Sequence, residues 1–178
     1  MTDLMTTGAY GALSEPATLT IKRSLPGPID RVWAYLTESE LRRKWLAAGE
    51  MEMKVGSSFE FVWRNNELTD PPGKMPEGAS GEHRMESEIT ELDPPHKISF
   101  TWGRSGGVTI ELKEQGEDVL LTLIHHRAPD RSTLLSVSTG WHTHLDVLVA
   151  RLSGQEPAPF WDSIARNRAE YEKIVPAE

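Results

Sequence analysis

Two histidines of this 178-residue chain, His83 and His125, fall at apolar positions of predicted strands and are the candidates for acid–base chemistry. An imidazole titrates near neutral pH, so either ring could act as a general acid or base. For a lone inward-facing histidine, a neutral ring hydrogen-bonded to a backbone or side-chain group is the commoner role. Catalysis therefore stays an open alternative, and a non-catalytic binding role is favoured.

A third histidine, His144, lies on a predicted helix and could join the other two, and three converging imidazoles are typical of a metal site. Nothing in the sequence shows that they converge, and the chain has no cysteine to supply thiolate ligands. His142 and His144 point to different helix faces, so they cannot bind one ion together. We interpret His142 as an exposed pair with Asp146, one turn on, and we expect no metal and no cofactor.

Large side chains that face one side of the predicted strands and helix form the second candidate site. Together with the histidines, the predicted ligand-binding set is Phe59, Phe61, Trp63, His83, Met85, Phe100, Trp102, His125, Trp141, His144, Leu145 and Leu148. As core, each large side chain would stabilise the fold by roughly 1.5–3 kcal/mol. As a lining, the set would enclose about 300–1,000 Å³. We expect at least half of the aromatic residues to be core, and Trp141 to be purely structural.

A strand and a meander must position these residues, since the hydrophobic period is two over most of the chain. The predicted strands are 18–25, 51–55, 59–63, 82–92, 98–102, 108–112 and 121–125. Successive short strands with one polar face indicate an antiparallel sheet. Its apolar face must be buried against another secondary-structure element.

Apolar residues at helical spacing predict the helices that would pack on this face. Two short helices, marked by Val32 and Trp45, follow the first strand. Near Trp141 a long amphipathic helix begins, with Ser138 or Thr139 as its cap and Gly154 at its end. A further helix spans about 161–174. The predicted class is α+β, with residues 1–16 as a loosely ordered arm and 17–178 as a single domain.

The segment 65–80 interrupts this pattern with three prolines and almost no periodicity. Loops of this length in a compact domain are usually functional or disordered. We expect it to gate the space between sheet and helix.

Composition narrows the function classes. The net charge of −8 argues against nucleic acid as a partner, because phosphate neutralisation dominates that kind of binding. No apolar run is long enough to span a membrane, and residues 1–10 do not resemble a secretory signal. A cytoplasmic location follows by elimination.

Four local motifs resemble one known family. They are Leu25-Pro26-Gly27-Pro28 with Val32-Trp33 and Leu36-Thr37, Arg43-Lys44-Trp45-Leu46, Leu121-Thr122-Leu123-Ile124-His125, and Gly140-Trp141 with Leu145 and Leu148. In this order they resemble the START-like helix-grip superfamily (SRPBCC), in the branch named after the activator of the heat-shock-protein-90 ATPase. The resemblance covers about 18–154.

The resemblance implies a curved sheet of six to seven strands wrapped around a long C-terminal helix, with a cavity between them in many members. It does not imply activation of the chaperone, because the co-chaperone's separate N-terminal domain has no room before the first strand.

Three hypotheses remain. The favoured one is a binding module that holds a small apolar or aromatic molecule in the cavity. The second is a cyclase- or hydrolase-type enzyme using an inward histidine. The third is a protein-interaction domain of the co-chaperone kind, or a homodimer formed through 160–174 or the sheet edge.

Overall fold

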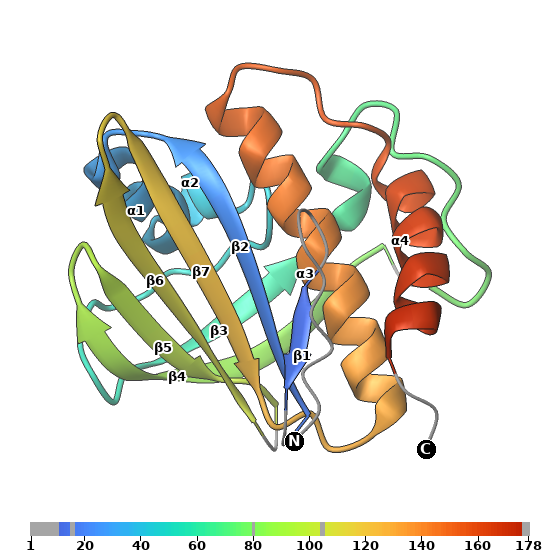
Figure 1. Cartoon of the computed structure of the whole chain (residues 1–178), viewed down its shortest axis with the longest axis horizontal. Coiled ribbons are helices and arrows are strands. Elements are labelled where there is room, and N and C mark those ends of the chain that lie inside the picture. The colour runs from blue at the N-terminus through green and yellow to red at the C-terminus, as the bar shows by residue number, and fades with distance from the viewer. Residues whose placement is uncertain (1–10, 15–16, 80, 104–105, 176–178) are drawn as a thin grey trace.

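An antiparallel sheet with a long helix on one face makes up most of the structure (Figure 1). The computed structural model describes residues 11–14, 17–79, 81–103 and 106–175. Within these ranges the sheet has seven strands in the order β1-β2-β7-β6-β5-β4-β3. They are β1 (Ala12–Ser14), β2 (Thr18–Pro26), β3 (Ser58–Trp63), β4 (His83–Asp93), β5 (Lys97–Thr101), β6 (Gly107–Gln115) and β7 (Asp118–His126). The predicted α+β helix-grip fold is confirmed.

Strand β4 pairs with a different neighbour in each of its halves. From His83 to Glu88 it pairs with β3, and from Ile89 onward with β5. The register with β5 shifts between Ile89 and Glu91, which marks a β-bulge. Because a bulge bends its strand, the half of β4 that carries Met85 turns with β3 and forms one end of the sheet.

The helices lie on the inner side of that sheet, with the last one packed on the long helix rather than on the strands. They are α1 (Ile29–Thr37), α2 (Ser39–Arg42), the 3-10 turn η1 (Asn65–Glu67), α3 (Arg131–Leu152) and α4 (Phe160–Ile174). The predicted stripe of Trp141, Leu145, Leu148 and Leu152 on α3 is buried. Figure 1 shows α3 along the sheet and α4 beside α3.

The long helix begins about ten residues earlier than predicted. Asp130 is its cap, and the Asp130 carboxylate accepts a hydrogen bond of 2.7 Å from the backbone N–H of Thr133. The predicted caps Ser138 and Thr139 lie inside the helix, and the hydroxyl of Thr139 donates to the carbonyl of Leu135. Serine, threonine and valine are weak helix formers. The local sequence pattern therefore did not predict the first part of the helix. Burial of Leu135 and its neighbours stabilises this part.

The strand predicted at 51–55 is wrong. This segment is irregular, and Met53 and Val55 are 40% and 55% exposed. The hydroxyl of Ser57 donates to the carbonyls of Glu52 and Lys54, which folds the backbone into a turn. At the other end of the sheet, β1 adds a strand within the predicted arm 1–16, of which residues 1–10 and 15–16 lie outside the described residues.

Arg42 fixes the segment that follows α2. It is 1% exposed, and its guanidinium donates to the carbonyls of Leu36, Thr37, Ala47 and Gly49. Burial lowers the pKa of Arg42 to about 10, so the side chain is still charged at neutral pH. Such a fork of donors can bind several carbonyls at once. It therefore holds 42–49 in the shape that carries Trp45 and Leu46 inward.

A buried polar network joins α3 to α4, and it corrects the prediction that His142 is exposed. His142 is 3% exposed and its Nδ1 is 3.0 Å from the hydroxyl of Tyr171 on α4. On its other side, Nε2 is 3.4 Å from the carboxylate of Asp146, which also pairs with Arg23 on β2. Phe160, Trp161 and Tyr171 of α4 are buried in the same chain, and Ile164 and Ile174 are half-buried. The predicted homodimer through α4 stays a prediction.

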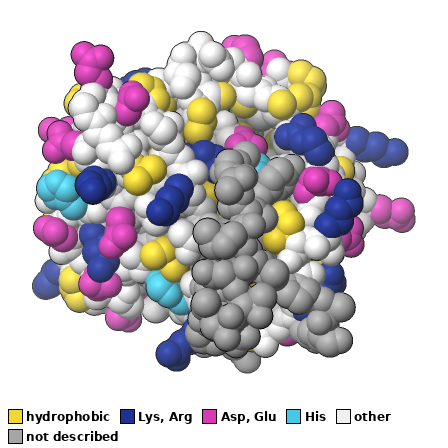
Figure 2. Space-filling model, viewed as in Figure 1, with side chains coloured by type: hydrophobic (Ala, Val, Ile, Leu, Met, Phe, Trp, Pro, Cys, Tyr) yellow, Lys and Arg dark blue, Asp and Glu magenta, His cyan; other side chains and the backbone are white. Residues whose placement is uncertain are grey.

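The surface carries charges of both signs. Acidic and basic side chains alternate over the face seen in Figure 2. None of the described helices is both long and apolar enough to cross a membrane.

Candidate ligand-binding cavity

A cavity of about 300 Å³ lies between the first part of α3 and the end of the sheet formed by β3 and β4. It is lined by Leu46, Trp63, Asn65, His83, Met85, Trp102, Ser136, Val137, Gly140, Trp141 and His144. Six members of the predicted ligand-binding set are among them. The predicted space between sheet and helix is therefore partly open.

Three indole rings form the apolar wall. The ring centroids of Trp63 and Trp102 are 5.7 Å apart, and those of Trp102 and Trp141 are 5.2 Å apart. Aromatic pairs at these centroid distances prefer edge-to-face or offset-stacked geometry, and a further ring could contact the indoles in the same way. The wall is therefore suited to a flat aromatic guest.

His144 supplies a polar group on the helix side. Its Nδ1 is 2.8 Å from the carbonyl oxygen of Trp45, and because a carbonyl only accepts, Nδ1 carries the proton. Burial lowers the pKa of His144 to about 4, so the ring is neutral at pH 7. Its Nε2 makes no hydrogen bond to any residue that the structure describes. That nitrogen is a hydrogen-bond acceptor for whatever enters the cavity.

Asn65 supplies a second acceptor at the end of β3. Its side-chain Oδ1 is buried and has no hydrogen-bond partner among the described residues. A buried polar atom without a partner destabilises a protein by about 1–3 kcal/mol. Asn65 lines the cavity, but this oxygen is itself closed off from the open space, so the side chain would have to turn before the oxygen could accept from a guest.

Gly140 makes the space on α3. It lies in the middle of a 22-residue helix, where glycine is about 1 kcal/mol less favourable than alanine. A Cβ added at Gly140 would meet nothing within 4 Å. Since Gly140 also lines the cavity, the missing side chain leaves the cavity open.

The other half of the predicted set is core. Phe59, Phe61, Phe100, Leu145 and Leu148 are 0–6% exposed and do not line the cavity. Phe61 packs between Phe59 and Phe100, with ring centroids at 4.9 and 5.4 Å. These side chains support the indole wall from beneath.

The two catalytic candidates take different positions. His125 is 1% exposed, and its Nδ1 accepts a 3.0 Å hydrogen bond from the indole N–H of Trp141. Burial is the main cause that lowers the pKa of His125 to about 4, and the charge of the nearby His126 lowers it further. His125 is therefore a neutral ring that orients Trp141, and it is not part of the cavity wall. Trp141 both anchors the helix and lines the cavity, so its predicted purely structural role is too narrow.

His83 is exposed at the rim, with its ring 5.4 Å from that of Trp63. The three histidines do not converge, and the residues that the structure describes contain no group of His, Cys, Asp or Glu arranged to hold a metal ion.

Sequence reasoning missed five lining residues: Leu46, Asn65, Ser136, Val137 and Gly140. Ser136 and Val137 belong to the part of α3 that was not predicted, whereas Gly140 lies at the predicted start of the helix. A glycine within a helical pattern was the one available signal, since glycine in a helix usually has a packing or functional reason.

The predicted gate, 65–80, is tied to the helices over its described part. The backbone N–H of Phe160 donates to the hydroxyl of Thr69, and that of Trp161 donates to the carbonyl of Pro72. Arg151 donates to the carbonyl of Leu68 at 2.6 Å. The start of this loop thus holds Asn65 at the cavity wall.

Comparison with known proteins agrees with this architecture. The model of the family described as "Activator of Hsp90 ATPase homolog 1-like protein" matches residues 26–153. The chain belongs to this family. The family match includes every residue of the cavity wall, whereas β1 and α4 lie outside it.

Solved structures resemble this chain over most of its length. A protein of Bordetella parapertussis solved by NMR is 33% identical with a TM-score of 0.79, over 98% of this chain and 97% of that one. CalU16 from Micromonospora echinospora is 18% identical with a TM-score of 0.67, over 94% and 90%. DynU16, from the dynemicin biosynthetic locus, is 18% identical with a TM-score of 0.62, over 79% and 49%. Among curated proteins, none matches this chain.

Proposed function

We propose that the protein binds a small aromatic molecule that carries a hydrogen-bond donor, in the cavity beneath α3. The observation that carries the proposal is the combination of an open, indole-lined space with two polar residues on its wall, His144 and Asn65, each of which has an acceptor without a partner among the described residues. Members of this fold often bind hydrophobic ligands. One similar structure comes from a biosynthetic locus, which fits a small-molecule role.

The cavity volume limits the size of the guest. An apolar cavity of about 150 Å³ holds one benzene ring. The volume of about 300 Å³ therefore suits roughly two fused rings.

The wall also limits the chemistry of the guest. Both acceptors lack a donor, so a phenolic O–H or a ring N–H would satisfy one of them. A purely apolar guest would leave both unpaired, which is unfavourable in a dry site. We expect a phenol to bind about fivefold more tightly than the matching hydrocarbon, as one neutral hydrogen bond contributes about 1 ± 0.5 kcal/mol.

Binding is better supported than catalysis. The histidine on the wall, His144, is neutral and a weak base because burial lowers its pKa to about 4. His125 is enclosed, and His83 stands at the exposed rim. Proton transfer near pH 7 calls for a group whose pKa is close to that value, which neither buried ring provides.

The experiment is a titration with naphthol and with naphthalene, followed by calorimetry and by tryptophan fluorescence. Saturable binding of naphthol with a change in indole emission is expected, since three indoles line the site. The matched control is Gly140→Leu, whose side chain would occupy the cavity. No saturable binding of either compound or of an indole series, or unchanged binding in the control, would sink the proposal.

A further inference from the structure

A second hollow, of about 360 Å³, lies behind the segment that follows α2. Val62 and Trp63 are neighbours on β3 and point to opposite sides. Trp63 lines the aromatic cavity, whereas Val62 lines this hollow. The two spaces are thus separated by β3 and the adjoining backbone of 44–48.

Cationic side chains dominate the wall of this hollow. Arg43, Lys44, Arg64 and Arg151 line it, and Glu67 is the single carboxylate among the lining residues. The four cations come from three separate parts of the chain, in a protein whose net charge is −8. Folding has therefore concentrated positive charge at this place.

Much of that charge is not neutralised within the protein. Lys44 makes no side-chain ion pair or hydrogen bond with any described residue. Among the described residues, Arg151 donates only to the backbone carbonyls of Lys44 and Leu68, at 3.3 and 2.6 Å. Two cations without an ion pair in the described structure therefore face a common space, on whose wall Glu67 is the one carboxylate.

The other two cations use only some of their donors within the protein. Arg43 uses its Nε toward Glu40, and Arg64 uses its Nε toward Glu82 at 3.1 Å. The Nη groups of both make no hydrogen bond to the described part of the chain. Guanidinium and ammonium groups only donate, so the hollow offers many donors and calls for a ligand rich in acceptors.

We propose that this hollow binds the phosphate group of a small phosphorylated molecule. A phosphate presents several charged acceptor oxygens, and forked arginine donors with a lysine match that geometry. The ring of Tyr35 and the methyl groups of Val62 line the same hollow and would contact the organic part. This site is separate from the aromatic cavity and does not depend on it.

The test is an NMR titration of the whole chain with inorganic phosphate and with phenyl phosphate, at ionic strength held constant with chloride. We expect saturable shifts for the backbone amides of 43–48 and 62–67. Tighter binding of phenyl phosphate identifies a phosphate monoester as the ligand class. Equal binding supports the same anion site with the free ion as its ligand.

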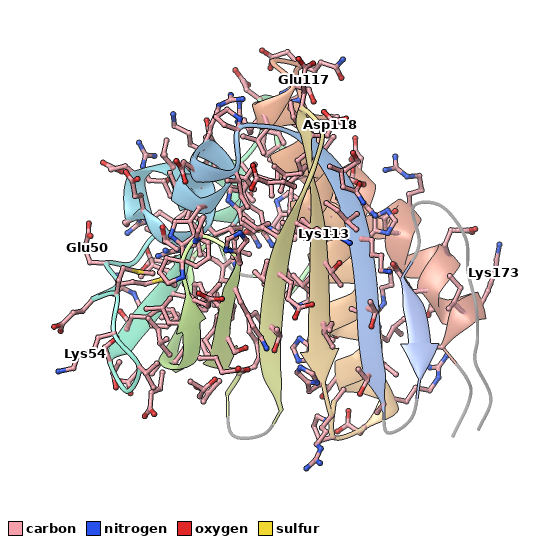
Figure 3. All side chains as sticks on the ribbon, turned by 60° about the vertical axis from the view of Figure 1, so that its left-hand side comes forward. Glu50, Lys54, Lys113, Glu117, Asp118 and Lys173 are labelled. Atoms are coloured by element: carbon pink, nitrogen blue, oxygen red, sulfur yellow. The ribbon has the colours of Figure 1, made fainter. Side chains whose placement is uncertain are left out.

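Lys44→Gln removes one cation without removing any contact of the described structure. We expect it to weaken phosphate binding about tenfold, because a hydrogen bond to a charged group contributes about 1.5–3 kcal/mol. The matched control is Lys113→Gln on β6, which lies on the sheet away from this hollow (Figure 3).

Two results would overturn the proposal: no saturable shifts at 43–48 with either compound, or equal weakening by both substitutions. Naphthol binding should be unchanged in Lys44→Gln, so failure here and failure of the aromatic cavity are distinguished.

Discussion

Substitutions at Gly140 test whether the space beneath α3 is open, because each one adds a side chain of known size to the cavity wall. Alanine at this position should stabilise the protein, since its Cβ meets nothing within 4 Å and alanine is about 1 kcal/mol better than glycine in a helix. For a chain of this size, 1 kcal/mol corresponds to a rise in Tm of about 2–4 °C. Urea unfolding and calorimetry measure both quantities.

Leucine at the same position separates stability from binding. It keeps the gain in helix propensity and places an apolar side chain in the cavity of about 300 Å³. We therefore expect a protein at least as stable as the original, with naphthol binding lost. A merely damaged fold would lose both properties.

Gly116 provides the matched control for the alanine substitution. A Cβ there also meets nothing within 4 Å, but the residue has a φ of +65°, so alanine should destabilise it by about 1–2 kcal/mol. If Gly140→Ala lowers the stability as Gly116→Ala does, the space at Gly140 is not open and the reasoning fails.

Three further predictions concern the framework of the site. Arg42→Met should destabilise the protein by about 3 kcal/mol or more in urea unfolding, because the carbonyls that Arg42 binds lose a buried donor. Tyr171→Phe should lower the unfolding free energy by about 1–3 kcal/mol, as the hydroxyl bonded to His142 is removed. Stability should also fall on acidification, because burial lowers the pKa of His125 and His144 to about 4 in the folded state, against about 6.5 when unfolded. The unfolded chain binds more protons between these values, so this stability is complete above about pH 6.5 and declines toward pH 4, by about 3 kcal/mol per ring at most.

Each of these has a contrary outcome. Unchanged unfolding in Arg42→Met would show that the 42–49 segment is held by other contacts. Wild-type stability of Tyr171→Phe would remove the network between α3 and α4 from the account. A flat stability between pH 4 and 6.5, or one that His144→Gln leaves equally steep, would contradict the burial of the rings.

Much of the sheet was predictable because strands such as β3 and β7 alternate between buried and more exposed positions. Leu121 and Leu123 on β7 face the core as the period-two pattern requires, and the family motifs fixed the order of the elements. The first part of α3 was not predictable from local pattern, since six of the eight residues from Ser132 to Thr139 are serine, threonine or valine, and tertiary burial decides their state. The 51–55 pattern misled because its apolar residues alternate without being buried.

The cavity itself could be predicted only as a region. Phe61 and Trp63 share one face of β3, yet Phe61 is core and Trp63 is cavity wall. Alternation assigns a face, but packing against other elements decides whether a side chain meets neighbours or open space. His142 shows the same limit, because α4, which covers it, is distant in the sequence.

The most direct test of the central claim is a crystal structure of the protein with naphthol bound. Our account predicts the two rings against Trp63, Trp102 and Trp141, with the hydroxyl donating to His144 Nε2 or to Asn65 Oδ1. Naphthol bound elsewhere on the protein, with the space beneath Gly140 filled by the protein's own side chains, would contradict it.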